Sequence, residues 1–386
     1  MSARILRACS APFLLIALSL FLAGCGNSHN IACVVPASGS CTCGPCPISN
    51  AEFLFATTST GQVLSSAIDH SSGALGSPAS VAGPTMSLGL AAAGSQFLYA
   101  SDFQTAQLYG YSINASSGVL TPINGSPFST GVLSLPAGLA TTPTGKFLYA
   151  MDVSKVDAFG INATSGVPTA TSGSPFFSGT GLQGVVSPSG QFLFQTDVDP
   201  PNGVFAFTID ATTGALTDVP GSPFPVPNQT VLNSTPFAIA IDPSGKFVYE
   251  ALTFTDQIAA WSVNQTTGVL TPVPGSPFTT GITPIFLTSV KNFLYTMTGG
   301  AVYAYTIDPG SGVLTPVTGS PFSVPATAGL VIDSSGTHLY CAAAASNGIF
   351  AFTIAADGSL TPLAGSPFPA TGPVLLTIVQ MPTQGE

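Results

Sequence analysis

Gly-Ser-Pro-Phe, at residues 125–128, decides the fold of this 386-residue chain because the phrase returns at a regular spacing. Further copies begin at Gly173, Gly221, Gly275, Gly319 and Gly365, and a degenerate copy, Gly-Ser-Pro-Ala, lies at 76–79. Successive copies are 44 to 54 residues apart. A repeat of that period indicates one supersecondary unit copied around an axis or along a solenoid. The phrase therefore predicts an architecture, and it carries no information about a reaction.

A second phrase, rich in aromatic residues, keeps the same period and marks a strand. It reads Lys-Phe-Val-Tyr at 246–249, and its seven copies begin at Glu52, Gln96, Lys146, Gln191, Lys246, Asn292 and Thr337. Most copies follow a turn such as Asp-Pro-Ser-Gly, in which Pro presets φ and Gly takes the position that other residues avoid. An apolar run before this turn, and an alternating stretch and a hairpin loop after the phrase, complete four short strands per unit. Helical periodicity is absent.

Four such strands joined by Gly, Pro and Asn turns are typical of one propeller blade. The repeats open at 53–55, the second strand of a blade, and close at 374–378, which matches the innermost strand of the other units. We therefore predict an all-β, seven-bladed β-propeller with four antiparallel strands per blade. Pairing of the C-terminal strand with the N-terminal blade closes the ring and removes exposed sheet edges. We expect the Phe of each Gly-Ser-Pro-Phe to fill the seam between neighbouring blades.

The N-terminal residues predict a processing segment. Arg4 and Arg7 precede an apolar run at 11–23 that is too short to span a bilayer. Leu-Ala-Gly-Cys at 22–25 resembles the lipobox of bacterial lipoproteins, which implies cleavage before Cys25 and lipid attachment to it. The alternative is an ordinary signal peptide followed by a chance Cys. We predict a lipoprotein signal peptide at 1–24, a lipidated tether at 25–50, the propeller at 51–380 and a tail at 381–386.

This reading places the protein at the bacterial cell envelope, held to the membrane by its lipid anchor. Gly26 follows the lipid-bearing Cys, where an Asp would resemble an inner-membrane retention signal, so the outer membrane is favoured. The protein would then face the periplasm or the cell surface.

Four cysteines crowd the tether, at Cys33, Cys41, Cys43 and Cys46. Outside the cytoplasm such a group indicates two disulfides. The spacing C-x₇-C-x-C-x₂-C matches no familiar zinc or iron–sulfur pattern. Four cysteines allow three pairings, and the connectivity stays open.

The charge balance excludes one class of partner. Charged residues make up 6% of the chain, and its formal net charge is −10. Arg4 and Arg7 are the only arginines, and both lie in the predicted signal peptide, so the remainder carries a net charge near −12 with four lysines as its only cations. Nucleic-acid binding and a polybasic membrane patch both need clustered Lys and Arg, and both are excluded.

The blade phrases carry a family resemblance. Pro-Ser-Gly-Lys-Phe-Val-Tyr at 243–249 and Val-Asn-Gln-Thr-Thr-Gly-Val-Leu-Thr-Pro at 263–272 resemble the seven-bladed propellers of the lactonase family, which includes 6-phosphogluconolactonase-like proteins. The resemblance covers about 330 residues and implies a lactone as possible substrate. A phosphorylated sugar needs cationic groups in its pocket. Lys146, Lys246 and Lys291 fall in turns opposite the usual pocket, and only Lys155 lies near the pocket side.

Carboxylates at the end of the aromatic strand are the candidate catalytic residues. Asp102, Asp152 and Asp197 take the same place in three adjacent blades, and Glu250 is expected near that level in the next. They could serve as acid and base, and Asp197 with Asp199 could hold Ca²⁺, the only cofactor considered. The alternative, which we favour, is that each Asp caps its own loop.

Other polar residues are interpreted as structural. His338 is expected to be a packed strand residue, His70 lies in a hairpin loop, and Cys341 is expected to be buried and inert. Six hairpin positions share an Asp or Asn that indicates turn chemistry, namely Asp69, Asn114, Asn162, Asp210, Asn264 and Asp308.

Three functions remain open. The favoured one is a non-catalytic envelope propeller that binds a protein, glycan or small ligand through its loops. The second is a lactone hydrolase acting on an unphosphorylated or small lactone, which predicts a polar pocket at the channel mouth near Asp102, Asp152 and Asp197. The third is a structural surface protein.

Overall fold

The computed structural model describes residues 51–129, 136–152, 154–177, 179–199, 202–228, 236–325 and 328–382, together with the backbone of 31–34 and 42–45. The chain divides into two compact units, one of which is Glu52–Gln380. The other unit, Met1–Ala51 with Met381–Glu386, contains the antiparallel strands β1 (Ile31–Val34) and β2 (Thr42–Pro45). No helix in the described part of the chain is long and apolar enough to cross a membrane.

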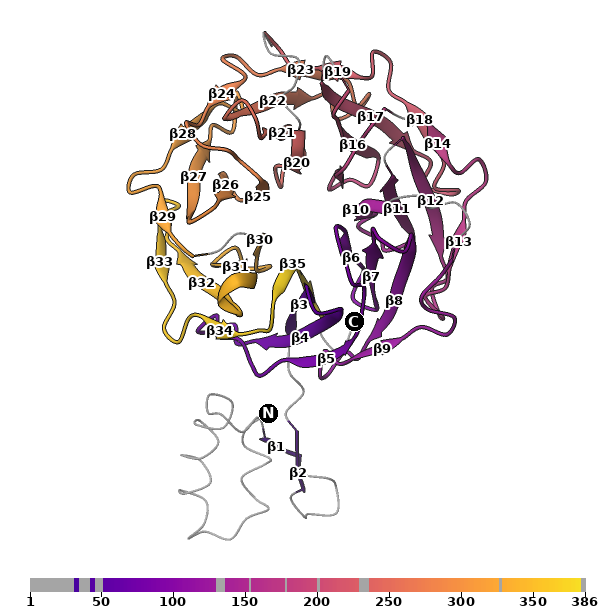
Figure 1. Cartoon of the computed structure of the whole chain (residues 1–386), viewed down its shortest axis with the longest axis vertical. Coiled ribbons are helices and arrows are strands. Elements are labelled where there is room, and N and C mark those ends of the chain that lie inside the picture. Colours follow the sequence, from indigo (N-terminus) through magenta and orange to yellow (C-terminus); the bar gives the residue numbers. More distant parts are fainter. Residues whose placement is uncertain are drawn as a thin grey trace, which may run out of the picture. The chain divides into compact units, whose positions relative to one another are not determined.

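Strands of Glu52–Gln380 form seven antiparallel sheets arranged as blades around a common axis (Figure 1). The predicted all-β seven-bladed propeller with four strands per blade is confirmed. Blade 1 consists of β35 (Pro373–Gln380), β3 (Glu52–Thr58), β4 (Gln62–Ile68) and β5 (Ala79–Ala82), from the axis outward. Blade 2 consists of β6 (Leu90–Ala93), β7 (Phe97–Asp102), β8 (Gln107–Ile113) and β9 (Leu120–Pro122).

The other five blades add a fifth short strand that pairs with the third strand of the blade. Blade 3 has β10 (Pro136–Thr141), β11 (Phe147–Asp152), β12 (Lys155–Ile161), β13 (Pro168–Ala170) and β14 (Phe176–Phe177). Blade 4 has β15 (Gly184–Val186), β16 (Phe192–Asp197), β17 (Gly203–Ile209), β18 (Leu216–Asp218) and β19 (Phe224–Pro225). Blade 5 has β20 (Pro236–Ile241), β21 (Phe247–Leu252), β22 (Gln257–Val263), β23 (Leu270–Pro272) and β24 (Phe278–Thr279).

Blades 6 and 7 follow the same plan. Blade 6 has β25 (Phe286–Val290), β26 (Phe293–Thr298), β27 (Ala301–Ile307), β28 (Leu314–Pro316) and β29 (Phe322–Ser323). Blade 7 has β30 (Ala328–Ile332), β31 (His338–Ala343), β32 (Gly348–Ile354), β33 (Leu360–Pro362) and β34 (Phe368–Pro369). A short 3₁₀ helix, η1 (Ala344–Ser346), lies between β31 and β32.

The Gly-Ser-Pro-Phe phrase holds the outer edge of blades 2 to 7 to the third strand. Its Ser Oγ accepts a hydrogen bond from an amide of the third strand, as Ser276 does from Ala260 at 2.8 Å. Its Phe pairs with the same strand and packs against the apolar cluster at the next seam, as Phe278 does. The predicted seam role of the Phe is confirmed. The strand that the Phe begins was not predicted, because the pairing joins segments that no sequence period relates.

Tyrosines of the second strands tie five of the seven blades to the next. Tyr149 donates a hydrogen bond to the carbonyl of Gly214 at 3.0 Å, and Tyr249 does so to Gly312 at 2.8 Å. The predicted hairpin Asp and Asn residues accept hydrogen bonds from loop amides, as Asn264 does from Thr266 and Thr267. These are the backbone contacts expected of turn residues.

The ring closes as predicted, by pairing of β35 with β3. The innermost strands of successive blades contact one another around the whole ring. Tyr340 of blade 7 donates a hydrogen bond of 2.8 Å to the carbonyl of Gly73 in blade 1. The last seam therefore uses the same contact as the seams that follow blades 2, 3, 5 and 6.

Candidate functional site at the channel mouth

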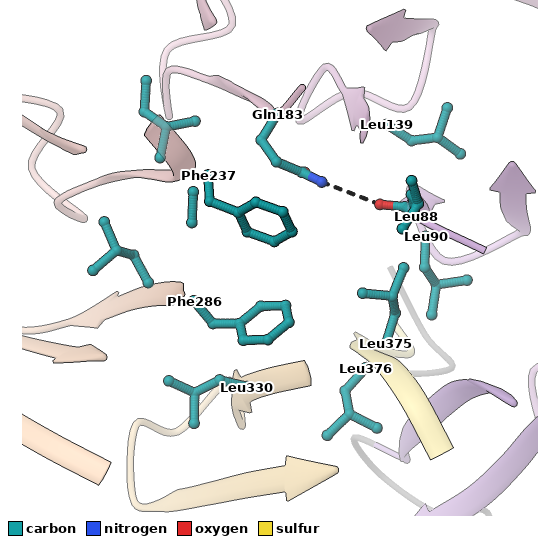
Figure 2. A pocket seen from close by; sticks show the side chains of 13 residues that line it. Leu88, Leu90, Leu139, Gln183, Phe237, Phe286, Leu330, Leu375 and Leu376 are labelled. Carbon is teal, nitrogen blue, oxygen red and sulfur yellow. Dashed lines mark hydrogen bonds between the residues drawn. The ribbon is translucent and has the colours of Figure 1, made fainter. Parts of the chain in front are cut away.

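A cavity opens on the axis at the end of the ring where the innermost strands begin, and we call this end the channel mouth. It encloses about 160 Å³ and is lined by Leu88, Gly89, Leu90, Leu139, Gln183, Phe237, Ala238, Ile239, Phe286, Leu287, Leu330, Leu375 and Leu376. Figure 2 shows leucine and phenylalanine side chains converging on this space from all sides. All seven blades contribute, because each sends the start of its innermost strand to the axis.

One lining side chain is polar. Gln183 reaches across the mouth, and its Nε2 donates a hydrogen bond of 3.1 Å to the carbonyl of Leu88 (Figure 2). In the next two blades the rings of Phe237 and Phe286 meet edge to face, with centroids 6.3 Å apart and an interplanar angle of 87°. Among the described lining residues the side chains are therefore mostly apolar and none is ionisable, while polar atoms make up about as much of the lining as apolar atoms do.

The second strands run antiparallel to the innermost ones, so Asp102, Asp152 and Asp197 end at the channel mouth as the sequence suggested. They lie one strand outward from the cavity wall. Their side chains are buried and interact with groups near their own loops. Asp102 accepts hydrogen bonds from the amides of Thr85, Gln104 and Thr105. Burial alone would raise the pKa of Asp102, but these hydrogen bonds outweigh it and hold the pKa below its usual value.

Asp197 and Asp199 also bond to loop backbone. Asp197 Oδ1 accepts a hydrogen bond from the Asp199 amide at 3.0 Å, and Asp199 Oδ2 accepts one from Thr180. Burial raises the pKa of Asp197 to about 6, against the effect of this hydrogen bond, and the charge of Asp199 adds to the rise. Among the described residues, no group of three or more His, Cys, Asp or Glu side chains is placed to hold a metal ion. Calcium binding by Asp197 and Asp199 stays a prediction.

Asp152 belongs to a compact charge group in blade 3. The ammonium of Lys155 lies 3.6 Å from Asp152 and 3.3 Å from Asp157, and both carboxylates are fully buried. Burial raises the pKa of Asp157 to about 6, although Lys155 opposes the rise. The other blades place Leu64, Tyr109, Phe205, Ala259, Tyr303 and Phe350 where blade 3 has Asp157. The one lysine expected near the pocket side is thus engaged by two buried carboxylates.

The predicted level of Glu250 is wrong. Leu252, paired with Gln257, takes the place in blade 5 that Asp197, paired with Gly203, takes in blade 4. Glu250 lies two residues earlier and pairs with Ile239, a residue of the cavity wall. The aromatic strand of blade 5 continues for two residues beyond Glu250, so Glu250 does not reach the strand end at which the aspartates lie.

Glu250 is the most unusual ionisable group of the described residues. It is fully buried, and neither carboxyl oxygen has a hydrogen-bond partner. Its neighbours on the same blade face, Ile239, Val248, Leu252 and Ala259, all belong to the apolar cluster at the seam with blade 4. Burial, and then the nearby charge of Asp197, raise the pKa of Glu250 well above its usual value. It is therefore a buried acid that favours its neutral form.

Sequence reasoning missed two further buried polar residues at this level. Gln195 of blade 4 and Thr296 of blade 6 occupy the strand position of Glu250, and their side-chain polar atoms also lack partners. Ala56, Ala100 and Ala150 fill the position in blades 1 to 3, and Cys341 fills it in blade 7. A polar residue where other copies have Ala is the signal that could have identified them.

His338 is buried at 6% exposure, and Cys341 is a free, fully buried thiol whose pKa is raised by burial. Both interpretations as packed strand residues are confirmed. The side chains of Cys33 and Cys43, and all of Cys25, Cys41 and Cys46, lie outside the described residues. The backbone pairs Cys33 with Cys43 across β1 and β2. The predictions of lipid attachment and of disulfides stay predictions.

Comparison with known proteins gives the fold a set of relatives. No family model matches the chain, and no curated protein matches it. Among solved structures, a periplasmic gluconolactonase of Pseudomonas aeruginosa is 17% identical with a TM-score of 0.65, covering 86% of this chain and 100% of its own. This chain has the same propeller fold as that protein.

Two further solved structures have the same fold. A candidate 6-phosphogluconolactonase from Bacteroides fragilis is 21% identical with a TM-score of 0.66, covering 86% of this chain and 98% of its own. One from Bacteroides uniformis is 19% identical with a TM-score of 0.67, covering 86% and 100%. At these identities the similarity establishes the seven-bladed propeller fold alone. The chemistry depends on the site residues of each chain.

Proposed function

We propose that this protein is a non-catalytic binding propeller of the bacterial cell envelope that takes a small apolar group into its channel mouth. The observation that carries the proposal is the wall of the cavity, in which Gln183 is the one polar side chain among the described residues. A volume of about 160 Å³ suits a group of the size of an aromatic ring or a short aliphatic chain. Engineered apolar cavities of about 150 Å³ take up benzene.

Exposed apolar side chains near the mouth support the same proposal. Met86, two residues before the lining residue Leu88, is 47% exposed, and Phe254, in the loop after β21, is 73% exposed. Apolar side chains exposed around a concave site are typical of recognition surfaces. Gln183 is the one described side chain of the wall that could hydrogen-bond a glycan hydroxyl, so we favour an apolar protein side chain or a small apolar molecule.

The cell-envelope part of the proposal rests on the predicted lipoprotein signal peptide. The apolar run at 11–23 and the Leu-Ala-Gly-Cys sequence at 22–25 support export and lipid attachment at Cys25, with the outer membrane favoured. An acylated Cys carries enough hydrocarbon for stable anchoring. The propeller would then face the periplasm or the cell surface.

Lactone hydrolysis is the second candidate, favoured by the names of the structural neighbours in Pseudomonas and Bacteroides. Hydrolysis needs an acid or base within hydrogen-bond reach of the substrate. Asp102 and Asp197 bond to loop amides, and Glu250 lies behind Ile239. The apolar mouth therefore supports binding better than it supports catalysis.

A ligand experiment on the chain from Gly26 onward, which keeps the whole Glu52–Gln380 unit, tests the proposal. Saturation-transfer NMR with n-hexanol should show transfer to the methyl end of the alcohol. Ala238→Leu fills the cavity and should weaken binding about tenfold, since a close-packed wall leaves no room for the guest. Val119→Leu, an exposed residue of a hairpin loop, is the matched control and should bind as the native chain does.

The same preparations separate the two candidates. Glucono-1,5-lactone should be hydrolysed no faster than in buffer. Turnover that disappears in Asp197→Asn but survives in Ala238→Leu would support the hydrolase and overturn the binding proposal. Absence of any transfer from n-hexanol would also overturn it.

A further inference from the structure

The carboxylates at the channel mouth lie in one sector of the ring. Second strands end and third strands begin at this end, so loops between them belong to the mouth. The buried Glu250 aside, its acidic residues all belong to the adjacent blades 2 to 5 (Figure 1), namely Asp102, Asp152, Asp157, Asp197, Asp199 and Asp256. Blades 6, 7 and 1 have their acidic residues at the opposite end, and the undescribed residues between 52 and 380 are all uncharged.

One cation lies at this end, and it is already paired. The Glu52–Gln380 unit has four lysines and no arginine. Lys146, Lys246 and Lys291 begin or precede second strands, at the end opposite the mouth. Lys155 lies at the mouth between the buried carboxylates of Asp152 and Asp157. The mouth therefore keeps an excess of negative charge.

Three of the carboxylates hold the segments that lead into the cavity wall. Each accepts a hydrogen bond from a threonine that stands three residues before a lining residue: Asp102 from Thr85 before Leu88, Asp199 from Thr180 before Gln183, and Asp256 from Thr283 before Phe286. The donor–acceptor distance is 3.0 Å in each of the three bonds. Because the lining residues belong to blades 2, 4 and 6, carboxylates adjoin the wall at three places around the axis.

Exposed apolar side chains lie at the same end. Four large apolar side chains of the described residues are exposed, and three of them are at the mouth: Met86, Phe177 and Phe254. Phe177 is 82% exposed and pairs with Lys155 at the start of β12. Phe254 shares a loop with Asp256, and Thr253 of that loop donates a hydrogen bond of 3.0 Å to the Pro284 carbonyl. The rim thus combines apolar contact with negative charge.

We propose that the mouth receives a segment of another protein in which an apolar side chain is flanked by lysine or arginine. The inference rests on the proposed function and adds the chemistry of the partner. The apolar side chain would enter the cavity, and the flanking cations would lie over the carboxylates of blades 2 to 5. Complementary charge selects such a partner and repels an acidic one. A second copy of this chain does not fit, because its net charge is also negative.

Three short peptides test the inference on the chain from Gly26 onward, with binding measured by fluorescence anisotropy. They are Lys-Lys-Phe-Lys-Lys, Glu-Glu-Phe-Glu-Glu and Lys-Lys-Ser-Lys-Lys. We expect the first to bind about tenfold more tightly than the second, because of charge, and about tenfold more tightly than the third, because of the buried ring. The preference over the glutamate peptide should shrink between about 0.1 M and 1 M salt, since the Debye length falls from about 10 Å to about 3 Å.

A matched pair of variants locates the charge that acts. Asp199→Asn/Asp256→Asn removes two carboxylates at the mouth and should weaken binding of Lys-Lys-Phe-Lys-Lys about fivefold. Asp210→Asn/Asp308→Asn removes the same charge from exposed hairpins at the opposite end, where other blades have Asn114, Asn162 and Asn264. This control should bind as the native chain does. Equal losses in the two variants would show that net charge alone acts, which would overturn the inference.

The outcomes separate this inference from the proposed function. A native chain that takes up n-hexanol but binds the lysine-flanked and glutamate-flanked peptides equally would overturn the inference and leave the proposed function in place. Equal binding of Lys-Lys-Ser-Lys-Lys and Lys-Lys-Phe-Lys-Lys would also overturn it, because the cavity would then contribute nothing. A native chain that takes up neither n-hexanol nor any peptide would overturn both. The salt series and the three peptides need no variant, so the test stands even if a substitution prevents folding.

Discussion

Glu250 in β21 pairs with Ile239 in β20, so a fully buried carboxyl lies one strand behind the wall of the channel mouth. The pairing explains why an acid that the sequence placed at the mouth has no access to it. Ile239 lines the cavity from the innermost strand, and Glu250 lies on the same face of the blade one strand outward, in the apolar seam with blade 4. A charged carboxylate there would lack any partner, which is costly in an apolar environment.

Glu250→Leu should stabilise the protein at alkaline pH. A carboxyl whose folded pKa is raised contributes its stability below the unfolded pKa and loses it as the pH rises through the folded pKa. We expect the variant to have a free energy of unfolding higher by about 1–3 kcal/mol at pH 8, and to differ little at pH 4. Urea unfolding at both pH values measures this. Thr296→Val, at the same position of blade 6, should show no such pH dependence, and a destabilised Glu250→Leu at pH 8 would contradict the argument.

Phe194→Tyr should add a seam contact that blade 4 lacks. Five blades place a Tyr at this strand position and bond its hydroxyl to a hairpin glycine carbonyl of the next blade, as Tyr249 does to Gly312. The carbonyl of Gly268 is the equivalent acceptor for blade 4, next to Phe192 of the same strand. We expect a gain of about 1 kcal/mol, measured as a higher Tm. Tyr249→Phe should lose a similar amount, and a lower Tm for Phe194→Tyr would mean that the seam has no room for the hydroxyl.

Ser276→Ala should lower the free energy of unfolding, because it removes the serine hydroxyl of one Gly-Ser-Pro-Phe copy. Ser276 is 4% exposed and accepts the hydrogen bond of the Ala260 amide at 2.8 Å. Its removal leaves a buried amide unpaired, which costs about 1–3 kcal/mol in the free energy of unfolding. Ser77→Ala, in the degenerate copy at 76–79 where the serine is exposed, should be neutral. Denaturant titration of both variants checks the difference, and equal values would refute the assigned role.

Lys155→Met should destabilise the protein more at pH 8 than at pH 5. The pKa of Asp157 is raised to about 6 by burial even with Lys155 beside it, so its carboxylate form already costs stability as the pH rises through that value. Removal of the ammonium raises the pKa of Asp157 further and leaves two buried carboxyl groups without their cation, at a cost of about 3 kcal/mol at pH 8. Thermal unfolding across this pH range measures the effect. Lys246→Met, at an exposed turn, is the control, and parallel pH profiles of the two variants would contradict the prediction.

Much of the fold could be read from repeated residues. Seven copies of the aromatic phrase predicted seven blades, and the run at 374–378 predicted the closing strand, since each signal depends on residues close in the chain. The added edge strand that begins at Phe278 and its equivalents could not be predicted. Its pairing with β22 brings together segments that are separated by a turn and another strand. Register between such segments is set by packing, and no local period encodes it.

The candidate site was predicted less well. The end of the ring at which Asp102, Asp152 and Asp197 lie was predicted correctly, because alternating strand direction fixes it. The level of Glu250 was not, because it depends on register with β20. The apolar character of the mouth was also missed, since Leu88, Phe286 and Leu375 are far apart in the chain and meet only at the axis.

The sequence by itself determined the repeating unit, the number of blades and the way the ring closes, because turn chemistry and strand alternation act over a few residues. Only the tertiary structure decided what lies at the axis and at the last seam. Seven innermost strands converge there, and the character of the cavity is the sum of seven distant contributions. His338 was one packed residue in the sequence; folding placed it beside Asp333 and against Gly73, at the seam that closes the ring.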